Sequence, residues 1–523
     1  MAWGRSGLAV LVAVAVAGLA VSGGSGGDPR TPEGLPGLPA PFLGTAVAGG
    51  GALTAAVDAY GDVVDLRPSP AGQALIENPA ARQAAGTVPA ATGIVPRVSF
   101  GGGPQLPLWR ADAVSQRYLP GTNVVRTRAR FAGGRVVVTV AAVGSELAVV
   151  ARPAGARARA SLSVHADGEG WTLCRRGCGR LIAAAVRDDR AWLARGRPLG
   201  SGAPAWARRM YARSLLTLRA LTDARTGAVA AGARDGWAYV WPRDAATAAL
   251  ALRAAGYRQE ARRVAGFLSR LDLAAAARFG GGGAPVPERG PQGDAPGWVR
   301  AAARATGASP LAAPAGPGAW GDAPDYQEGG AGDYLGNAIA AEAALNPFDT
   351  PAGLVRRAGD PASGLDSAAA WAVEPFSRPA AFTAARRTLL SLLRGATPYG
   401  ITPGEGWSGG VDPWTAPTAW SAWALAALAG AEAVTAPRRA RADRGAALRL
   451  LSDLRRAATP AGSLPERVDA RSGIPRSTTP LAWPHAFAAL TLLRLWPSAC
   501  EDCAAVRESF SPHRGKKLAP TLR

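Results

Sequence analysis

Five segments of the sequence combine an acidic residue with tryptophan, tyrosine or glycine near the start of an expected helix. They are "DGWAYVWPRD" (235–244), "PVPERGPQGDAPGW" (285–298), "DAPDYQEGG" (322–330), "PGEGWSGGVDPW" (403–414) and "SLPERVDARSGIPRSTTPLAWPH" (463–485). Aromatic faces can stack on the apolar faces of sugar rings, while aspartate and arginine can hydrogen-bond hydroxyl groups. Carboxylates in a partly dry pocket can act as acid and base. The mixture therefore favours a carbohydrate pocket.

Each segment alone also has an ordinary structural interpretation. A tryptophan at a helix start is more often part of the core than of a ligand site, and a loop aspartate or glutamate usually caps a helix or faces water. Five segments of similar chemistry on successive loops of one region are much harder to explain in this way.

The region that carries these segments has a helical pattern of apolar residues. We expect helices over 205–223, 243–257, 258–272, 331–345, 380–395, 415–434, 438–458 and 479–496. Long loops rich in glycine, proline and aspartate separate them, and such loops are unusual in a compact domain unless they carry function. The pattern indicates a closed ring of helical hairpins, over 205–497, whose loops gather at one end.

The preceding region has the alternation of short strands instead. The segments 51–66, 123–154, 159–174 and 180–195 show it most clearly. They predict an all-β domain over 42–197, a sandwich. A flexible leader over 23–41 precedes it, and a basic tail over 498–523 follows the helical region.

The bulk composition fits a soluble globular protein. The chain has 523 residues, 48% of them hydrophobic, and its mean hydropathy is +0.03. The net charge of +21 would normally suggest a nucleic-acid partner. All but two of the 59 basic residues are arginine, however, and they are scattered without a long basic run. We therefore expect no nucleic-acid partner.

The first 22 residues have the layout of an export signal. Arg5 precedes an apolar run from Leu8 to Val21, and small residues follow, with a cleavage position after Ser22. The run is short for a bilayer span, which needs ~20 residues, and an uncleaved membrane anchor is the alternative. We expect a secreted or cell-envelope-associated protein.

The four cysteines form two close pairs, Cys174/Cys178 and Cys500/Cys503. Their flanks lack the histidines of a zinc site, and export favours disulfides. We expect two local disulfides.

Several motifs together resemble the glucoamylase-like glycoside hydrolases of family 15. They are "GWAYVWPRDAA", "PVPERGPQGDAPGW", "PDYQE", "GLDSAAAWAVEPF", "GVDPW" and "LPERVD" followed by "TPLAWPHAF", and they occur in the family's order and spacing. The resemblance spans about Pro41 to Trp496 and is closest to the bacterial branch. It implies an N-terminal β-sandwich followed by an (α/α)6 barrel. It also implies an inverting exo-glycosidase that releases terminal α-linked glucose from glucans or disaccharides.

The family's functional residues can be carried over to matching positions. Glu328 in "PDYQE" matches the general acid, and Glu466 in "LPERVD" matches the general base. The expected substrate-binding residues are Trp237, Tyr239, Trp241, Arg243, Asp244, Gln292, Asp294 and Trp483, with core packing an equally good account of Trp483. In an inverting enzyme the two carboxyl groups lie about 6.5–9.5 Å apart. Two glutamates so distant in sequence can meet only if the helical region closes on itself.

The chain departs from the family pattern near the acid. Gln327 and Gly329 replace a tryptophan and a second glutamate, and Arg467 replaces a glutamine after the base. The fourth segment has Ile401-Thr402 and Gly404-Glu405 in place of Arg-Tyr and Glu-Asp. The alternative to an active enzyme is therefore a catalytically weakened carbohydrate-binding or cell-envelope protein on the same fold. We expect no cofactor, no metal site and a monomer.

Overall fold

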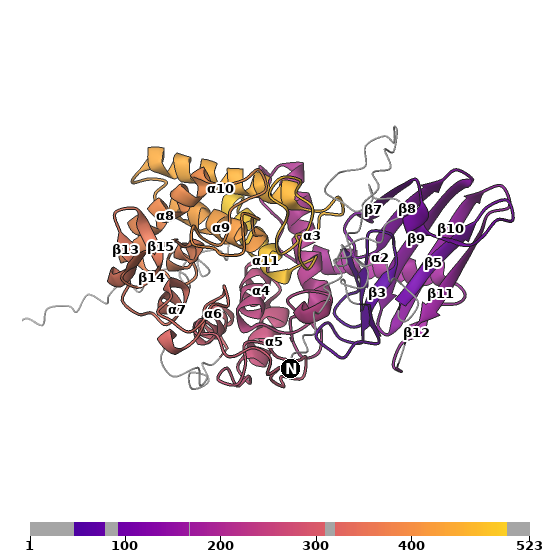
Figure 1. Ribbon diagram of the computed structural model, residues 1–523, viewed down its shortest axis with the longest axis horizontal. Coiled ribbons are helices and arrows are strands. Elements are labelled where there is room, and N and C mark those ends of the chain that lie inside the picture. Colours follow the sequence, from indigo (N-terminus) through magenta and orange to yellow (C-terminus); the bar gives the residue numbers. More distant parts are fainter. Residues whose placement is uncertain (1–45, 79–92, 167, 309–319, 499–523) are drawn as a thin grey trace, which may run out of the picture.

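The structure, a computed structural model, describes residues 46–78, 93–166, 168–308 and 320–498. The expected export signal, leader, basic tail and Cys500/Cys503 pair lie outside these residues. Two bodies lie side by side in Figure 1, one made of strands and the other mainly of helices.

The strands form two sheets that enclose one apolar core. The first sheet has the order β1-β2-β3-β5-β11, with β4 on β3 and β6 on β5. Its strands are β1 (Ala46–Ala48), β2 (Thr54–Val57), β3 (Val63–Arg67), β4 (Ile76–Glu77), β5 (Gly93–Ser99), β6 (Leu106–Pro107) and β11 (Arg159–His165). The second has the order β12-β10-β9-β8-β7. Its strands are β7 (Ala113–Tyr118), β8 (Val125–Phe131), β9 (Gly134–Val143), β10 (Glu146–Gly155) and β12 (Thr172–Leu173).

The expected sandwich is confirmed because alternate residues of these strands point inward. In β8 the buried residues are Val125, Thr127, Ala129 and Phe131, and arginines alternate with them. Residues from both sheets meet in the same buried cluster, as the period of two requires.

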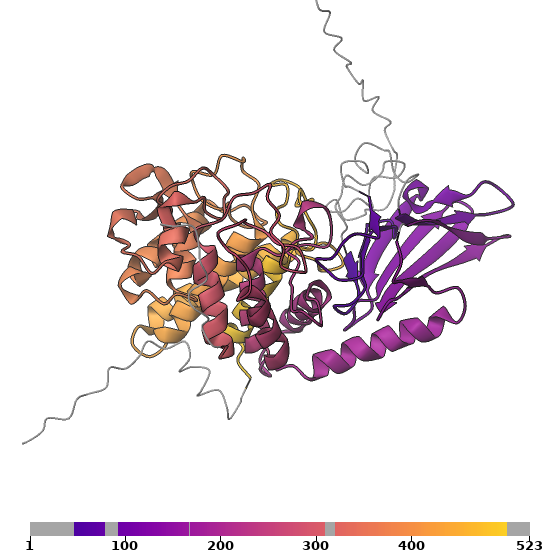
Figure 2. The same cartoon turned by 90° about the horizontal axis from the view of Figure 1, so that it is seen from below.

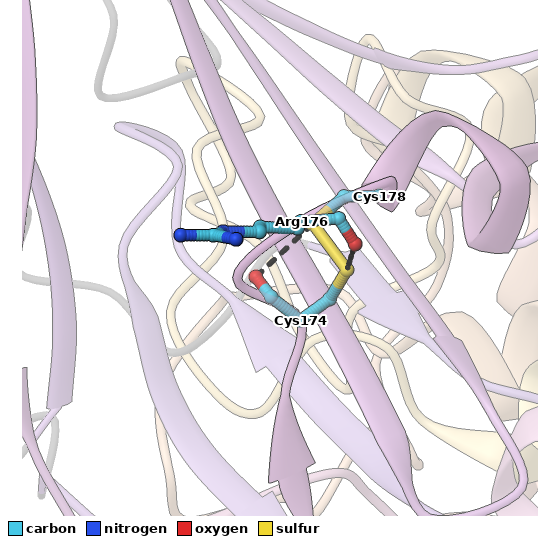
Figure 3. The surroundings of a disulfide bond; sticks show 3 residues. All are labelled: Cys174, Arg176 and Cys178. Atoms are coloured by element: carbon cyan, nitrogen blue, oxygen red, sulfur yellow. Dashed lines mark hydrogen bonds between the residues drawn. A yellow bond between two sulfur atoms is a disulfide. The ribbon is translucent and has the colours of Figure 1, made fainter.

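The expected strand over 180–195 is wrong, because this segment belongs to helix α2 (Cys178–Ala194). It is rich in alanine, leucine and arginine, which favour helices. Its buried residues Ala185, Asp189 and Trp192 have helical spacing. The helix packs on β9 and β10 and leads towards the helical body (Figure 2). The Cys174–Cys178 disulfide at its start confirms one of the two expected pairs (Figure 3).

The helical body contains most of the expected helices. They are α3 (Ala205–Leu221), α4 (Pro242–Ala254), α5 (Arg258–Leu268), α6 (Ala295–Thr306), α7 (Leu335–Ala340), α8 (Phe382–Arg394), α9 (Thr415–Ala431), α10 (Pro437–Ala457) and α11 (Ala482–Leu495). The sequence pattern missed α6, and the helix expected over 331–345 is reduced to α7. A small sheet of β13 (Asp349–Thr350), β14 (Gly353–Arg357) and β15 (Asp360–Leu365) was also not expected.

The short 3-10 helices within the described residues lie mainly in loops. They are η2 (Leu108–Arg110), η3 (Asp235–Trp237), η4 (Trp320–Asp322), η5 (Asn346–Phe348), η6 (Ser367–Ala372) and η7 (Pro379–Ala381).

Six helices form a closed inner ring. Going round it, α4 packs on α6, α6 on α7, α7 on η6, η6 on α9, α9 on α11, and α11 on α4. Helix α9 consists almost wholly of buried alanine, tryptophan and leucine, whereas α10, which packs outside it, buries one face only. A helix that is apolar all round must lie inside the body. No helix within the described residues is long and apolar enough to cross a membrane.

Each of the five chemistry-bearing segments leads up to or into the start of an inner helix. The segment 235–244 enters α4, 285–298 enters α6, 322–330 precedes α7, 403–414 precedes α9, and 463–485 enters α11. Three inner helices, α4, η6 and α9, are followed by outer helices that pack on them, α5, α8 and α10. The ring therefore collects these segments at one end.

Candidate active site

Glu466 lies in the loop before α11, where two side chains hold its carboxylate. Trp237 Nε1 donates a hydrogen bond to Oε1 at 3.3 Å, and the Ser477 hydroxyl donates to Oε2. The main chain of Glu466 is paired on both sides, with Thr478 O at 2.9 Å and Thr415 N at 2.9 Å. Burial raises the pKa of Glu466, and the hydrogen bonds from Ser477 and Trp237 oppose that shift. Sequence reasoning missed Ser477.

Glu328 lies on a tight turn. Its N–H donates to Asp325 O at 2.9 Å, and the N–H of Gln327 donates to Asp325 Oδ1 at 3.0 Å. The backbone of Glu328 has φ of +55°, a left-handed conformation that is uncommon outside glycine and that often marks functional sites. The side chain is about one-third exposed and forms an ion pair with Arg289, while Gln292 Nε2 donates to Oε1 at 3.3 Å.

Arg289 joins the two glutamates into one site. It contacts Glu328 directly, and its positive charge also lowers the pKa of Glu466. The ring thus brings these residues of two distant segments to the same place. Arg289 stands in the second segment, but sequence reasoning gave it no role.

Arg243 and Asp244 occupy the first turn of α4 and are almost wholly buried. Arg243 Nη1 donates to Asp294 Oδ2 and to Gln292 Oε1, each at 2.8 Å. The guanidinium lies over the ring of Trp483, with Cζ 4.5 Å from the centroid. Arg243 is thus held by Asp294 and Gln292, and that set connects through Gln292 to Glu328.

Asp244 carries an unusual carboxyl group. Burial raises its pKa to about 7, and the charges of Glu466 and Asp294 add to the shift, while Arg243 opposes it. The neighbouring charges show that Asp244 lies near the expected base.

Arg278 lies beside Tyr239 and Trp241, the two residues of the expected aromatic wall. The Arg278 Cζ lies 4.7 Å from the Tyr239 ring centroid and 5.5 Å from that of Trp241. Tyr239 and Trp237 are partly exposed, whereas Trp241 is buried. Arg278 also pairs with Glu288 at 2.8 Å.

Trp483 is buried behind Arg243. Its ring packs against Trp420, at 4.8 Å between centroids, and against Tyr326 and Phe487. The buried position of Trp483 favours the core-packing account. Its link to the site is the contact of its ring with the guanidinium of Arg243.

A buried polar network lies beneath the Glu328 turn. Asp366, which caps η6, accepts hydrogen bonds from Tyr326 Oη at 2.9 Å and from Gln327 Nε2 at 2.8 Å. Arg356 forms a forked contact with Asp325, at 2.9 and 3.2 Å. Sequence reasoning missed Asp325, Asp366 and Arg356, although an aspartate before the serine of "GLDSAAAW" is a common helix-cap signal.

The departures from the family pattern have structural counterparts. A side chain at position 329 would start 3.2 Å from Tyr334 Oη and 3.3 Å from Arg356 Nη2, so these groups fill the space beside Gly329. Ile401 is buried, and its N–H donates to Thr418 Oγ1 at 3.0 Å. Glu405 Oε2 accepts from Leu365 N at 3.1 Å. Among the described residues no three His, Cys, Asp or Glu side chains gather as metal ligands.

Comparisons with known proteins bear on the fold of the chain. Residues 205–275 match the sequence model of the Glycosyl hydrolases family 15. A bacterial glucoamylase in complex with acarbose superimposes with a TM-score of 0.58 at 12% identity, over 90% of this chain and 96% of that chain.

Two other structures overlap mainly with part of this chain. A glucoamylase from Saccharomycopsis fibuligera has 14% identity and a TM-score of 0.44, over 57% of this chain and 96% of its own. A wild-type glycosidase has 18% identity and a TM-score of 0.44, over 59% and 99%. A search of curated proteins gave no significant match. The superposition on the bacterial glucoamylase shows that the chain has a glucoamylase-like fold.

Proposed function

We propose that this protein is an exported, inverting exo-glycosidase that releases terminal α-linked glucose from a glucan or disaccharide. The family match and the fold support a glycoside hydrolase of the glucoamylase-like kind. The observation that carries the proposal is that Arg289 pairs with Glu328 while its charge also lowers the pKa of Glu466. The first candidate substrate is a chain of α-1,4-linked glucose, and the next candidates are α-1,6 glucan and trehalose.

In the proposed reaction Glu328 is the general acid. It gives its proton to the glycosidic oxygen as the bond from that oxygen to C1 breaks. Arg289 forms an ion pair with Glu328 in the structure, and this contact must open before Glu328 can act as the acid.

Glu466 is the general base. It takes a proton from the water whose oxygen bonds to C1 on the opposite face, and the products are free glucose with inverted configuration and the shortened chain. Trp237 and Ser477 orient the carboxylate towards that water.

The sugar in the pocket would lie against Tyr239 and near Asp244. An ionised Asp244 accepts hydrogen bonds from hydroxyl groups. Arg243, which is held by Asp294, lowers the pKa of Asp244 and so favours this ionised form. The bacterial relative binds acarbose, which supports a glucan-type ligand here.

The test is a substrate screen with matched variants. The wild type should release glucose from at least one of maltooligosaccharides, isomaltose, dextran and trehalose. Glu328→Gln and Glu466→Gln should each lower kcat by about 10²–10⁴-fold, whereas Glu342→Gln, an exposed residue paired with Arg304, should not. Full activity in either site variant would reject its assigned role.

The second candidate is a carbohydrate-binding protein without hydrolytic activity. The Arg289–Glu328 ion pair and the space taken by Tyr334 and Arg356 beside Gly329 favour it. Saturable binding of maltooligosaccharides in a calorimeter, with no glucose released, would support it over the enzyme.

A further inference from the structure

The sandwich reaches the candidate active site through one buried arginine. Arg234, in the loop between α3 and α4, is 1% exposed, and its Nη2 donates to Asn78 O directly after β4. Its charge also acts on Asp65 of β3, which Arg67 grips with two hydrogen bonds of 2.8 Å. A cluster of three buried charges therefore lies where the two bodies meet.

This cluster confines the loop that follows it. A buried guanidinium is costly to leave without partners, so the loop at Arg234 cannot shift without losing its contacts to the sandwich. Trp237 N donates to Arg234 O at 3.3 Å, and Gly232 N donates to Trp237 O at 2.8 Å. A side chain at Gly232 would start 3.0 Å from Trp237 Cβ and 2.7 Å from Thr478 Oγ1, so the loop is also closely packed against the segment after Ser477.

The same loop carries the hydrogen-bond donor to the proposed base. Trp237 Nε1 donates to Glu466 Oε1, only three residues after Arg234. A continuous path of contacts thus leads from Asn78 O in the sandwich, through Arg234 and Trp237, to Glu466.

A second contact fixes the neighbouring loop. Gly281 N donates to Ala71 O, which follows β3, at 2.8 Å, and a side chain at Gly281 would start 3.0 Å from that oxygen. Two residues earlier, Phe279 pairs through its main chain with Val240. The sandwich therefore contacts both loops behind the aromatic wall, the one at Arg234 and the one at Gly281.

We propose that Arg234 is a positioning residue, through which the sandwich orients Trp237 and thereby the carboxylate of Glu466. The inference rests on the proposed function for the role of Glu466. It assigns the sandwich a task in catalysis as well as in folding.

The test replaces Arg234 and compares the variant with one at a second arginine, Arg219, which joins α3 to α2. Arg234→Met keeps a long side chain without charge, and Arg234→Lys keeps the charge. The control is Arg219→Met in α3, because Arg219 pairs with Asp188 and Asp189 of α2 and touches none of the site residues. Asp65→Asn is a milder variant should Arg234→Met fail to fold.

Arg234→Met should lower kcat at least tenfold beyond Arg219→Met, with less than a threefold change in KM. The acidic limb of its kcat–pH profile should move to higher pH, because Trp237 no longer favours the ionised base. Arg234→Lys should recover most of kcat, and Asp65→Asn should show a smaller loss in the same direction. Equal kcat in Arg234→Met and Arg219→Met, with unmoved pH limbs, would overturn the inference.

A second readout does not require activity. The indole N–H resonance of Trp237, assigned with Trp237→Phe, should shift in Arg234→Met and in Glu466→Gln and stay in place in Arg219→Met. An unchanged resonance in Arg234→Met would refute the positioning role. A wild type that hydrolyses nothing while the resonance shifts would instead contradict the proposed function alone.

Discussion

At the scale of single residues, the site depends on buried charges that hold one another. Arg243 can stay ionised beneath the pocket because Asp294 neutralises it and Gln292 takes a further hydrogen bond. One nitrogen, Nη1, donates to both carboxylate oxygens of Asp294, at 2.8 and 3.1 Å, so the charge is paired at a single end of the guanidinium. Gln292 also donates a hydrogen bond to Glu328, and it thereby connects the Arg243–Asp294 pair to the proposed acid.

Asp294→Asn should therefore be strongly destabilising. It leaves the Arg243 charge buried without its counter-ion, a loss of about 3 kcal/mol in the free energy of unfolding. Asp349→Asn, which removes a solvent-exposed pair with Arg387, should cost at most about 1 kcal/mol. Urea denaturation of both variants checks this, and similar losses in the two would contradict the buried-pair account.

The motifs located these residues but not their partners. The blocks around Arg243, Asp294 and Glu466 carry recognisable spacing, so each residue could be placed in the site from the sequence. Ser477 and Arg289 have no such pattern of their own, and their contacts arise only when distant loops meet. Whether Arg243 and Asp244 hold sugar hydroxyls stays a prediction.

At the scale of elements, the Glu328 turn rests on a polar network instead of an apolar floor. Asp366, at the cap of η6, binds both Tyr326 and Gln327, the two residues before Glu328. Gln327 replaces the family's tryptophan at this position, and the structure shows a use for its amide. Burial, together with the charge of Asp325, raises the pKa of Asp366 to about 7.

Asp366 should make stability depend on pH. Its pKa in the folded protein is far above its ordinary value of 3.8, so its contribution to stability is complete below about pH 4 and is lost as pH rises through about 7. Asp366→Asn cannot ionise, so its free energy of unfolding, relative to wild type, should rise by at least about 1 kcal/mol between pH 4 and pH 7. Chemical denaturation at several pH values measures this, beside Asp360→Asn as a partly exposed control. A constant difference across the range would contradict the buried-carboxylate account.

Element prediction was reliable for the long segments of the helical region that are rich in alanine and leucine, and weaker elsewhere. Helix α9 is apolar all round and α10 is one-sided, and both were found. The α2 segment was taken for a strand because its neighbours alternate, although its alanines and arginines favour a helix. Helix α6 follows a long loop and begins with Ala-Pro-Gly, a weak helical pattern that hid it.

At the scale of the whole molecule, a β-sandwich lies against a closed ring of helices. The ring could be foreseen because paired amphipathic helices with long loops need a common core. The junction could not be foreseen, since Arg234, Asp65 and Asn78 look like ordinary loop and strand residues in the sequence. Their burial is a property of two bodies in contact. The export and the cellular location of the chain stay predictions.

The most direct test of the central claim follows the configuration of the released sugar. Proton NMR of wild-type protein with maltotriose resolves the two anomeric protons of glucose before mutarotation mixes them. Glu328 as acid and Glu466 as base on opposite faces predict that β-glucose appears first and that Glu466→Gln releases almost none. Initial release of α-glucose would contradict the inverting mechanism and the roles assigned to these two residues.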